Sequence, residues 1–444
     1  MQRPSYGTLR PAAWWLLVIS GLFSLSIGLS NTFVNIFIWK VDKSYSSAAW
    51  YNLSMYVIVP FSFIAAGWIA HRWRTVISLR LGIATHAAFY LSTLWFGLAL
   101  ARNPMLMGAF MGLATGLFWF AFNTLSLQYT TDGNRSSFVG TNGVFASIAG
   151  MLAPPVAGYL IGREDRYFGG LTGFHVVFGI SVILFAMGTV LSFRLHSAPV
   201  HHYFRWRKAL LRLSNVNWRL KMMGCFVYGI REGVFLFLIG LLFFVATGSE
   251  LKLGEFFLLQ SGLAFVSNFL AGRVSRGRRR IYILGLGAVG MMSCAFLFLL
   301  PVTAVRLVLY GSLISVVLPF FLVPLQSLLY RQMETMVANH QGWSEEHVVV
   351  REFFENAGRV FGIAVFLVLG MNGGLTVTRI AYFAFSLGFV QLGTWILFWR
   401  SERRNEARVL ENVHSVNEDW REYRDRRRES EIESRTKFRV KHKI

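Results

Sequence analysis

The stretch from His347 to Gly370, HVVVREFFENAGRVFGIAVFLVLG, joins a strongly charged half to an apolar half. Its polar side chains fall on one helical face, at i, i+4 and i+8, and at two positions offset by one: Arg351, Glu355 and Arg359, with Glu352 and Asn356. If the segment crosses a bilayer from Val348, a rise of about 1.5 Å per residue places Arg359 roughly 16 Å deep, near the midplane. A charge at that depth is costly, which indicates a function.

The composition indicates an integral membrane protein. Of 444 residues, 54% are apolar and 15% are charged, and the mean hydropathy is +0.48. A soluble protein could not bury so many long apolar runs. The formal charge of +22 alone is compatible with nucleic-acid binding. The basic residues lie in short gaps between apolar segments, however, where they orient a membrane protein. We therefore expect contact with membrane lipids and no nucleic-acid partner.

Hydropathy predicts an all-α fold with twelve transmembrane helices. The first six are Trp14–Trp39, Ala48–Ala70, Ser78–Ala101, Met105–Gln128, Val139–Gly162 and Gly173–Leu195. The other six are Met222–Thr247, Gly254–Gly272, Ile281–Leu300, Ala304–Tyr330, Val348–Gly370 and Leu375–Trp399. The predicted organisation is an N-terminal segment (1–13), a six-helix bundle (14–195), a basic central loop (196–221), a second six-helix bundle (222–399) and a charged tail (400–444).

Lysine and arginine concentrate in alternate gaps between the apolar runs, as in the cluster of residues 273–280. This distribution predicts that both termini, the central loop and the tail of this multi-pass protein lie in the cytoplasm. The central loop is compatible with an amphipathic helix on the inner leaflet and with a solvated linker.

Two loops at equivalent places in the halves have similar sequences, as an internal repeat predicts. Gly67-Trp-Ile-Ala-His71-Arg72-Trp-Arg74 follows the second helix, and Gly272-Arg273-Val-Ser-Arg276 follows the eighth. The first resembles the G-x-L-A-D-R-x-G-R loop of the major facilitator superfamily, with His71 in place of the acid. The resemblance covers residues 14–399 and implies the fold of that superfamily, a role in gating for both loops, and a monomer.

The fifth helix contains a second motif, Gly150-Met-Leu-Ala-Pro154-Pro155-Val-Ala-Gly158. It resembles the Gly-Pro motif of many exporters in the superfamily, which favours export over import. Small residues and prolines permit close contact between bent helices, as the seam between two moving halves requires.

Two signatures resemble a group of poorly characterised superfamily porters from Gram-positive bacteria. They are GIREGVF at 229–235 and VVVREFFENAGR at 348–359. The chain resembles the lipoteichoic-acid glycolipid flippase, of the same fold, more distantly. The resemblance to these porters implies a multi-pass protein of the bacterial plasma membrane.

Arg231 and Glu232 lie about ten residues into the seventh helix, close to the depth of Arg359. Adjacent helical residues point about 100° apart, so only one of the two is expected to meet Glu355 or Arg359. An unpaired central charge costs about 3 kcal/mol, so these charges should be paired or lie in a wet cavity. Two roles are compatible with the pattern. Either the network is a fixed ion-pair lock, or an arginine receives an anionic substrate group while Glu232 or Glu355 takes up a proton.

Further polar side chains are candidates for binding a sugar or head group, since helices one, four, seven and ten line cavities in the superfamily. They are Asn31, Asn35, Trp119, Asn123 and Gln326. Hydrogen bonding between helices explains the asparagines equally well, and a packed or lipid-facing position explains Trp119.

We expect a secondary transporter that alternates access between its halves, and more specifically an antiporter for proton-coupled efflux of an anionic or amphiphilic small molecule. One alternative is a flippase for a lipid-linked cell-envelope intermediate, which a laterally open cavity would favour. Another is a transport-inactive membrane scaffold. The sequence contains no constellation typical of a nucleophile, metal site or phosphate loop, so we expect no enzyme, metal or cofactor.

Overall fold

The computed structural model describes residues 9–130, 134–168, 172–197, 204, 206–275, 277–339, 344–371, 374–407 and 424. All regular elements in these ranges are helices. Those before the central connection are α1 (Pro11–Asp42), α2 (Tyr45–Arg72), α3 (Thr75–Ala101), α4 (Pro104–Tyr129), α5 (Arg135–Phe168) and α6 (Thr172–Ser192). The connection contains α7 (Trp206–Leu211) and η1 (Arg212–Ser214). There follow α8 (Val216–Thr247), α9 (Glu250–Val274), η2 (Gly277–Arg279), α10 (Arg280–Ala295), η3 (Phe296–Leu299), α11 (Ala304–Ala338), α12 (Ser344–Met371), α13 (Val377–Leu387) and a helix over residues 390–407.

Twelve segments of the described chain are long and apolar enough to cross a membrane. The ninth, Gly277–Leu299, combines η2, α10 and η3, and the twelfth, Val377–Ala407, continues from α13 through a turn at 388–389. The prediction of an all-α membrane fold with twelve transmembrane helices is confirmed.

Several helices extend beyond their predicted spans. The helix α8 begins at Val216 instead of Met222, because the side chain of Asn215 caps it. The Asn215 Oδ1 accepts hydrogen bonds from the backbone N–H groups of Asn217 (3.1 Å) and Trp218 (3.4 Å). The helix α11 likewise continues to Ala338, past the predicted end at Tyr330. Hydropathy detects the apolar run, whereas capping determines where the helix ends.

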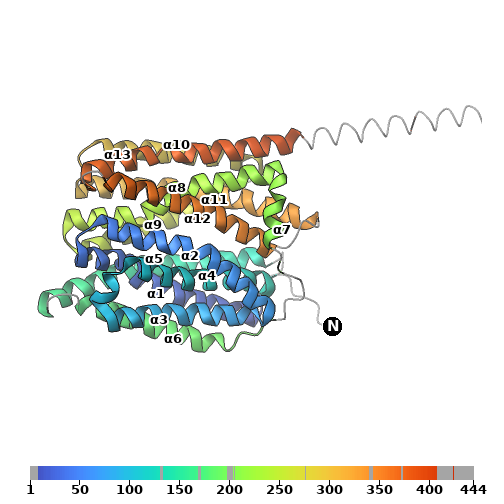
Figure 1. The fold of residues 1–444 in the computed structure, drawn as a ribbon. Helices are drawn as coiled ribbons and strands as arrows, with labels where there is room; N and C mark the ends of the chain where they lie inside the picture. Colours follow the sequence, from blue (N-terminus) through green and yellow to red (C-terminus); the bar gives the residue numbers. More distant parts are fainter. Residues whose placement is uncertain are drawn as a thin grey trace, which may run out of the picture.

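The helices form two groups that lie side by side (Figure 1). Helices α1–α6 pack on one another, as do α8–α13, and the closest pairs between the groups are α5 with α9 and α2 with α12. The start of α1, α7 and the end of the 390–407 helix lie at one end of the bundle. We call this the basic end, since the connections with Arg74 and with Arg278–Arg280 also lie there. Its location in the cytoplasm stays a prediction.

The Gly-Pro motif of α5 lies at the contact with α9, between the two groups. A Cβ added at Gly158 would meet the carbonyl oxygen of Glu250 at 2.3 Å, and one at Gly254 would meet that of Pro154 at 2.6 Å. About two turns further along, the hydroxyl of Ser261 donates a hydrogen bond of 3.0 Å to the carbonyl of Gly150. The motif therefore lies at the seam, with backbones in direct contact.

The two groups also meet at the end opposite the basic end. Lys40 on α1 forms an ion pair with Glu250 on α9, with 2.5 Å between Nζ and Oε1. Beside it the rings of Trp39 and Phe244 are in edge contact, with centroids 5.7 Å apart. These contacts close the space between the groups at that end.

Candidate functional site

A cavity of about 420 Å³ lies between the two groups of helices. Helices α2 and α4 form one wall, and α8, α11 and α12 form the other. The lining runs from Glu232 and Arg359, about halfway along α8 and α12, to Tyr330 and Arg351, nearer the basic end. The cavity thus extends from the middle of the bundle toward the basic end, and its size is that of pockets that take small organic ligands.

Close contact between the backbones of α8 and α12 positions the charged wall. A Cβ added at Gly358 would lie 1.9 Å from the carbonyl oxygen of Phe226, and one at Gly229 would lie 2.1 Å from that of Glu355. Gly362 and Gly233 also face the opposite helix, where an added Cβ would lie 2.1 Å from the carbonyl oxygen of Ile230 and 2.7 Å from the Cα of Arg359, respectively. Each helix therefore has glycines four residues apart, the spacing that allows transmembrane helices to touch. The sequence interpretation missed this G-x-x-x-G signal, which is present in both helices.

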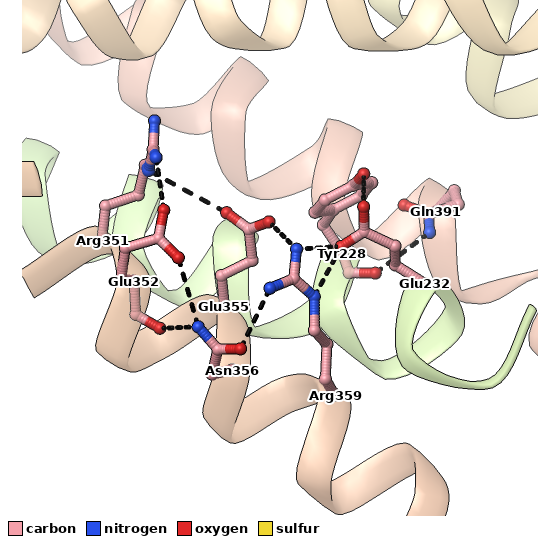
Figure 2. A network of polar contacts seen from close by, with 8 residues as sticks. All are labelled: Tyr228, Glu232, Arg351, Glu352, Glu355, Asn356, Arg359 and Gln391. Carbon is pink, nitrogen blue, oxygen red and sulfur yellow. Dashed lines mark hydrogen bonds and ion pairs between the residues drawn. The ribbon is translucent and has the colours of Figure 1, made fainter. Parts of the chain in front are cut away.

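Arg359 is the centre of the polar network between these helices (Figure 2). Its Nε and Nη2 donate hydrogen bonds of 2.8 and 2.6 Å to Glu232 Oε2 on α8. The same Nη2 donates to Glu355 Oε1 at 2.5 Å, and Nη1 donates to Asn356 Oδ1 at 3.0 Å. The Tyr228 hydroxyl donates to the other oxygen of Glu232 at 2.6 Å. Two carboxylates therefore share one guanidinium nitrogen.

A second guanidinium extends the network toward the basic end. Arg351 Nη2 donates to Glu352 Oε1 at 2.5 Å, and its Nε lies 4.0 Å from Glu355 Oε2. The Asn356 amide donates to both the carboxylate (3.2 Å) and the backbone carbonyl (2.8 Å) of Glu352. Glu355 therefore lies between the two arginines. All the charged residues predicted on α12 come together here, each with a partner, as the cost of an unpaired charge requires.

Arg231 lies apart from this network, whereas its neighbour Glu232 belongs to it. The Arg231 guanidinium donates a hydrogen bond of 2.9 Å to the Tyr310 hydroxyl and stacks 4.2 Å from the centre of the Phe235 ring. This separation agrees with the angle of about 100° between adjacent helical residues. Arg231 is therefore placed in the packing between α8 and α11.

The other predicted polar residues divide between the cavity and the helix contacts. Trp119, Asn123 and Gln326 line the cavity. Asn35 instead accepts a hydrogen bond of 2.7 Å from the Asn52 amide on α2, and neither it nor Asn31 is among the lining residues. The sequence interpretation did not include Tyr56 and Tyr228, which line the cavity on either side of Arg359. Nothing in the periodicity distinguishes these tyrosines from other aromatic residues.

The residues of the predicted gating loops lie at the basic end. Arg72 and Arg74 are exposed there, His71 is half-buried, Gly272 is exposed, and Arg273 stacks 4.1 Å from the Phe269 ring centre. Arg276 lies outside the described residues. Gly67 is packed against the central connection: a Cβ added to it would meet the Phe204 ring at 2.6 Å.

We expect Gly67→Leu to displace Phe204 and loosen the central connection, because the added side chain would occupy the place of the ring. Cleavage by trypsin after Arg207, measured on the purified protein, should become about tenfold faster if local opening costs about 1.4 kcal/mol less. Gly140→Leu is the control, since a Cβ at Gly140 meets nothing within 4 Å. Equal cleavage rates in both variants would show that Phe204 does not hold the connection.

The comparisons with known proteins agree with this architecture. The family model described as Major Facilitator Superfamily matches residues 16–342. The chain belongs to the major facilitator superfamily. The D-xylose-proton symporter has a similar fold, with a TM-score of 0.68 and 13% identity over 88% of this chain and 98% of that one. A mutant of the nucleoside transporter NupG is similar too, with a TM-score of 0.67 and 12% identity over 87% of this chain and 99% of the other.

Two sequence relatives come from bacteria. The uncharacterised protein YqgE of Bacillus subtilis (strain 168) is 39% identical over 357 residues, which is 80% of this chain and 82% of YqgE. An uncharacterised protein from the sodM 3' region of Geobacillus stearothermophilus is 39% identical over 146 residues, 33% of this chain and 68% of that protein. The superfamily and the twelve apolar helices indicate a multi-pass secondary transporter of the bacterial membrane and not an enzyme, as predicted.

Proposed function

We propose that this superfamily member is a proton-coupled exporter of an amphiphilic small molecule, which occupies the cavity between the two groups of helices. The observation that carries this proposal is the single Arg359 nitrogen shared by Glu232 and Glu355 inside the cavity. Neighbouring carboxylates with one positive partner favour uptake of one proton, since like charges oppose the ionisation of both. Ionisable residues at this depth mark transport paths.

The two walls of the cavity support an amphiphilic substrate. The wall from α2 and α4 is mainly aromatic and aliphatic, with Tyr56, Val59, Phe63 and Trp119. The other wall carries all the charged lining residues of the described chain. A molecule with one apolar and one polar part can therefore satisfy both walls. The export direction rests on the resemblance of the α5 motif to those of exporters.

The contacts between the two groups of helices support a cycle of alternating access. The contacts of Lys40 with Glu250 and of Trp39 with Phe244 close the end opposite the basic end, while the cavity extends toward the basic end. Opening the opposite end requires these contacts to separate while the α5/α9 and α2/α12 seams rock. The substrate would bind when the Glu232–Arg359–Glu355 group has released its proton, and the proton would bind when the substrate has left. One is therefore exported as the other is taken up.

Transport in proteoliposomes tests the coupling. With an acidic lumen and the membrane potential clamped, protons leaving the vesicle should drive accumulation of a compound from a panel of charged and neutral amphiphiles. Glu355→Gln cannot take up the proton, so gradient-driven accumulation should fall about tenfold or more, the size of effect usual for a positioned proton carrier. Glu255→Gln, an exposed acid on α9, is the matched control.

Three other outcomes would decide the matter differently. Undiminished gradient dependence in the Glu232→Gln/Glu355→Gln double variant would overturn proton coupling at this group. Accumulation driven by an alkaline lumen would identify symport in place of antiport. The alternative of a membrane scaffold would be favoured if no compound of the panel were transported and the cavity variants bound these compounds as well as the parent protein does.

A further inference from the structure

The charged side chains that line the cavity are unequal in number. Among the described lining residues there are three acids and two arginines: Glu232, Glu352 and Glu355 against Arg351 and Arg359. When all five are ionised, the cavity carries one surplus negative charge. Arg231 does not alter this balance, because it is turned toward Tyr310 and is not a lining residue. The other lining groups that can lose a proton are three tyrosines and a cysteine, which add no positive charge: Tyr56, Tyr228, Tyr330 and Cys225.

Both guanidiniums already contact carboxylates of the protein itself. Arg359 donates four hydrogen bonds, two to Glu232 and one each to Glu355 and Asn356. A guanidinium has five N–H donors, so one remains. Arg351 contacts both Glu352 and Glu355. An anionic substrate would add a second negative charge to a cavity that already has one in surplus, and it would compete with the protein's own carboxylates for the two arginines, which is unfavourable.

The wall opposite the charges contains aromatic rings that suit a cation. Tyr56 lies with its ring centre 5.1 Å from the guanidinium carbon of Arg359, so a cation already rests against this wall. Trp119 lines the same wall and has 38% of its surface exposed, although its ring also packs on Phe118 and Phe122. Faces of tryptophan and tyrosine attract ammonium-like groups, most strongly where water is excluded.

We propose that the substrate of this cavity is an amphiphilic organic cation. Its positive group binds to the surplus carboxylate charge of Glu232 and Glu355, and its apolar part lies against the aromatic wall of α2 and α4. The cation and the coupling proton then compete for the same negative charge, so that one leaves as the other arrives. This inference rests on the proposed transport function, and of the anionic or amphiphilic small molecules expected from the sequence it selects an amphiphilic one with a positive charge.

Two ions of nearly the same shape and opposite charge test the inference: tetraphenylphosphonium and tetraphenylborate. Binding of each to the purified protein in a nonionic detergent is measured by equilibrium dialysis, with 2-phenylethylamine and 3-phenylpropanoate as a smaller pair. We expect the cations to bind and the anions not to bind. Glu232→Gln and Glu355→Gln should each weaken cation binding about tenfold or more, because each removes the surplus charge. Glu255→Gln should leave it unchanged.

Competition provides a second measurement on the same samples. Lowering the pH should weaken binding of tetraphenylphosphonium to the parent protein, because protons occupy the carboxylates, and this dependence should disappear in Glu355→Gln. Replacing Trp119 with leucine should weaken binding of the cation and leave the polar network of α8 and α12 intact. This variant therefore measures the contribution of the aromatic wall separately from that of the charged wall.

The results distinguish this inference from the transport function. The inference of a cationic substrate would be overturned if the protein preferred the anions. It would also be overturned if Glu232→Gln and Glu355→Gln left binding of the cations unchanged. Failure of every cation to bind would overturn it as well. The proposed function would survive each of these results if another compound were transported along the proton gradient and Glu355→Gln abolished that transport.

Discussion

Replacing Arg359 with glutamine should abolish transport and destabilise the folded protein by about 3–5 kcal/mol. The reason is that Glu232 and Glu355 both depend on this guanidinium, at 2.6 and 2.5 Å from its Nη2. Removing one partner of a buried ion pair leaves the other charge without compensation, which costs more than the pair contributes. In this variant the surplus negative charge of the cavity doubles, and no guanidinium separates the carboxylates of Glu232 and Glu355.

Thermal unfolding in detergent measures the loss. Cys225 and Cys294 are both buried, so a thiol-reactive fluorophore reports unfolding without further labelling. Arg102→Gln, which removes an exposed arginine at the connection between α3 and α4, is the control for loss of positive charge alone.

A compensating change distinguishes a structural ion-pair lock from a transport site. In Arg359→Gln/Glu355→Gln the original charge balance returns, so most of the lost stability should return with it. Transport should stay absent, because the group that exchanges a proton is gone. A double variant that is as unstable as Arg359→Gln would show that the shape of the guanidinium, and not its charge, holds the helices. Recovery of transport together with stability would assign the network a purely structural role.

The spacing of the charges on α12 was readable from the sequence. The i, i+4 pattern of Arg351, Glu355 and Arg359 survives unchanged in the structure, since helical periodicity alone determines which side chains share a face. The partner on α8 was readable only as a choice between Arg231 and Glu232. That choice depends on the rotation of α8 about its axis, which the packing of another helix determines.

The packing of the glycines against α12 determines how α8 is rotated about its axis. Gly229 and Gly233 must face α12 for the backbones to approach. At about 100° per residue, Glu232 points about 60° from Gly229, on the side of Arg359, whereas Arg231 points about 160° away from it. Arg231 is thereby directed toward α11. The same limit applies to Asn35, whose hydrogen bond to Asn52 follows from the rotation of α1 against α2. Contacts between helices distant in sequence are not encoded in the periodicity of either one.

The contact between α8 and α12 should be the part of the molecule least tolerant of added volume. Gly358→Leu would place a Cβ 1.9 Å from the carbonyl oxygen of Phe226, an atom that cannot move without moving the whole of α8. We expect a loss of about 3 kcal/mol or more, at or above the upper range for overpacking, because the obstacle is backbone and not a flexible side chain. The yield of monodisperse protein in size-exclusion chromatography should fall sharply.

The matched control is Gly262→Leu on α9, where a Cβ meets nothing within 4 Å. The smaller change Gly358→Ala is more informative about function. It adds the same Cβ without the branched end of leucine, so the helices need to separate only far enough to relieve the contact with the Phe226 carbonyl. This separation should lengthen the bonds from Arg359 to Glu232 while Arg359 and Glu355 stay together on α12. If glycine packing sets the geometry of the charged group, this variant should remain folded and lose proton-coupled transport. A folded Gly358→Ala protein with full transport would show that the network tolerates the separation and that the glycines serve packing alone.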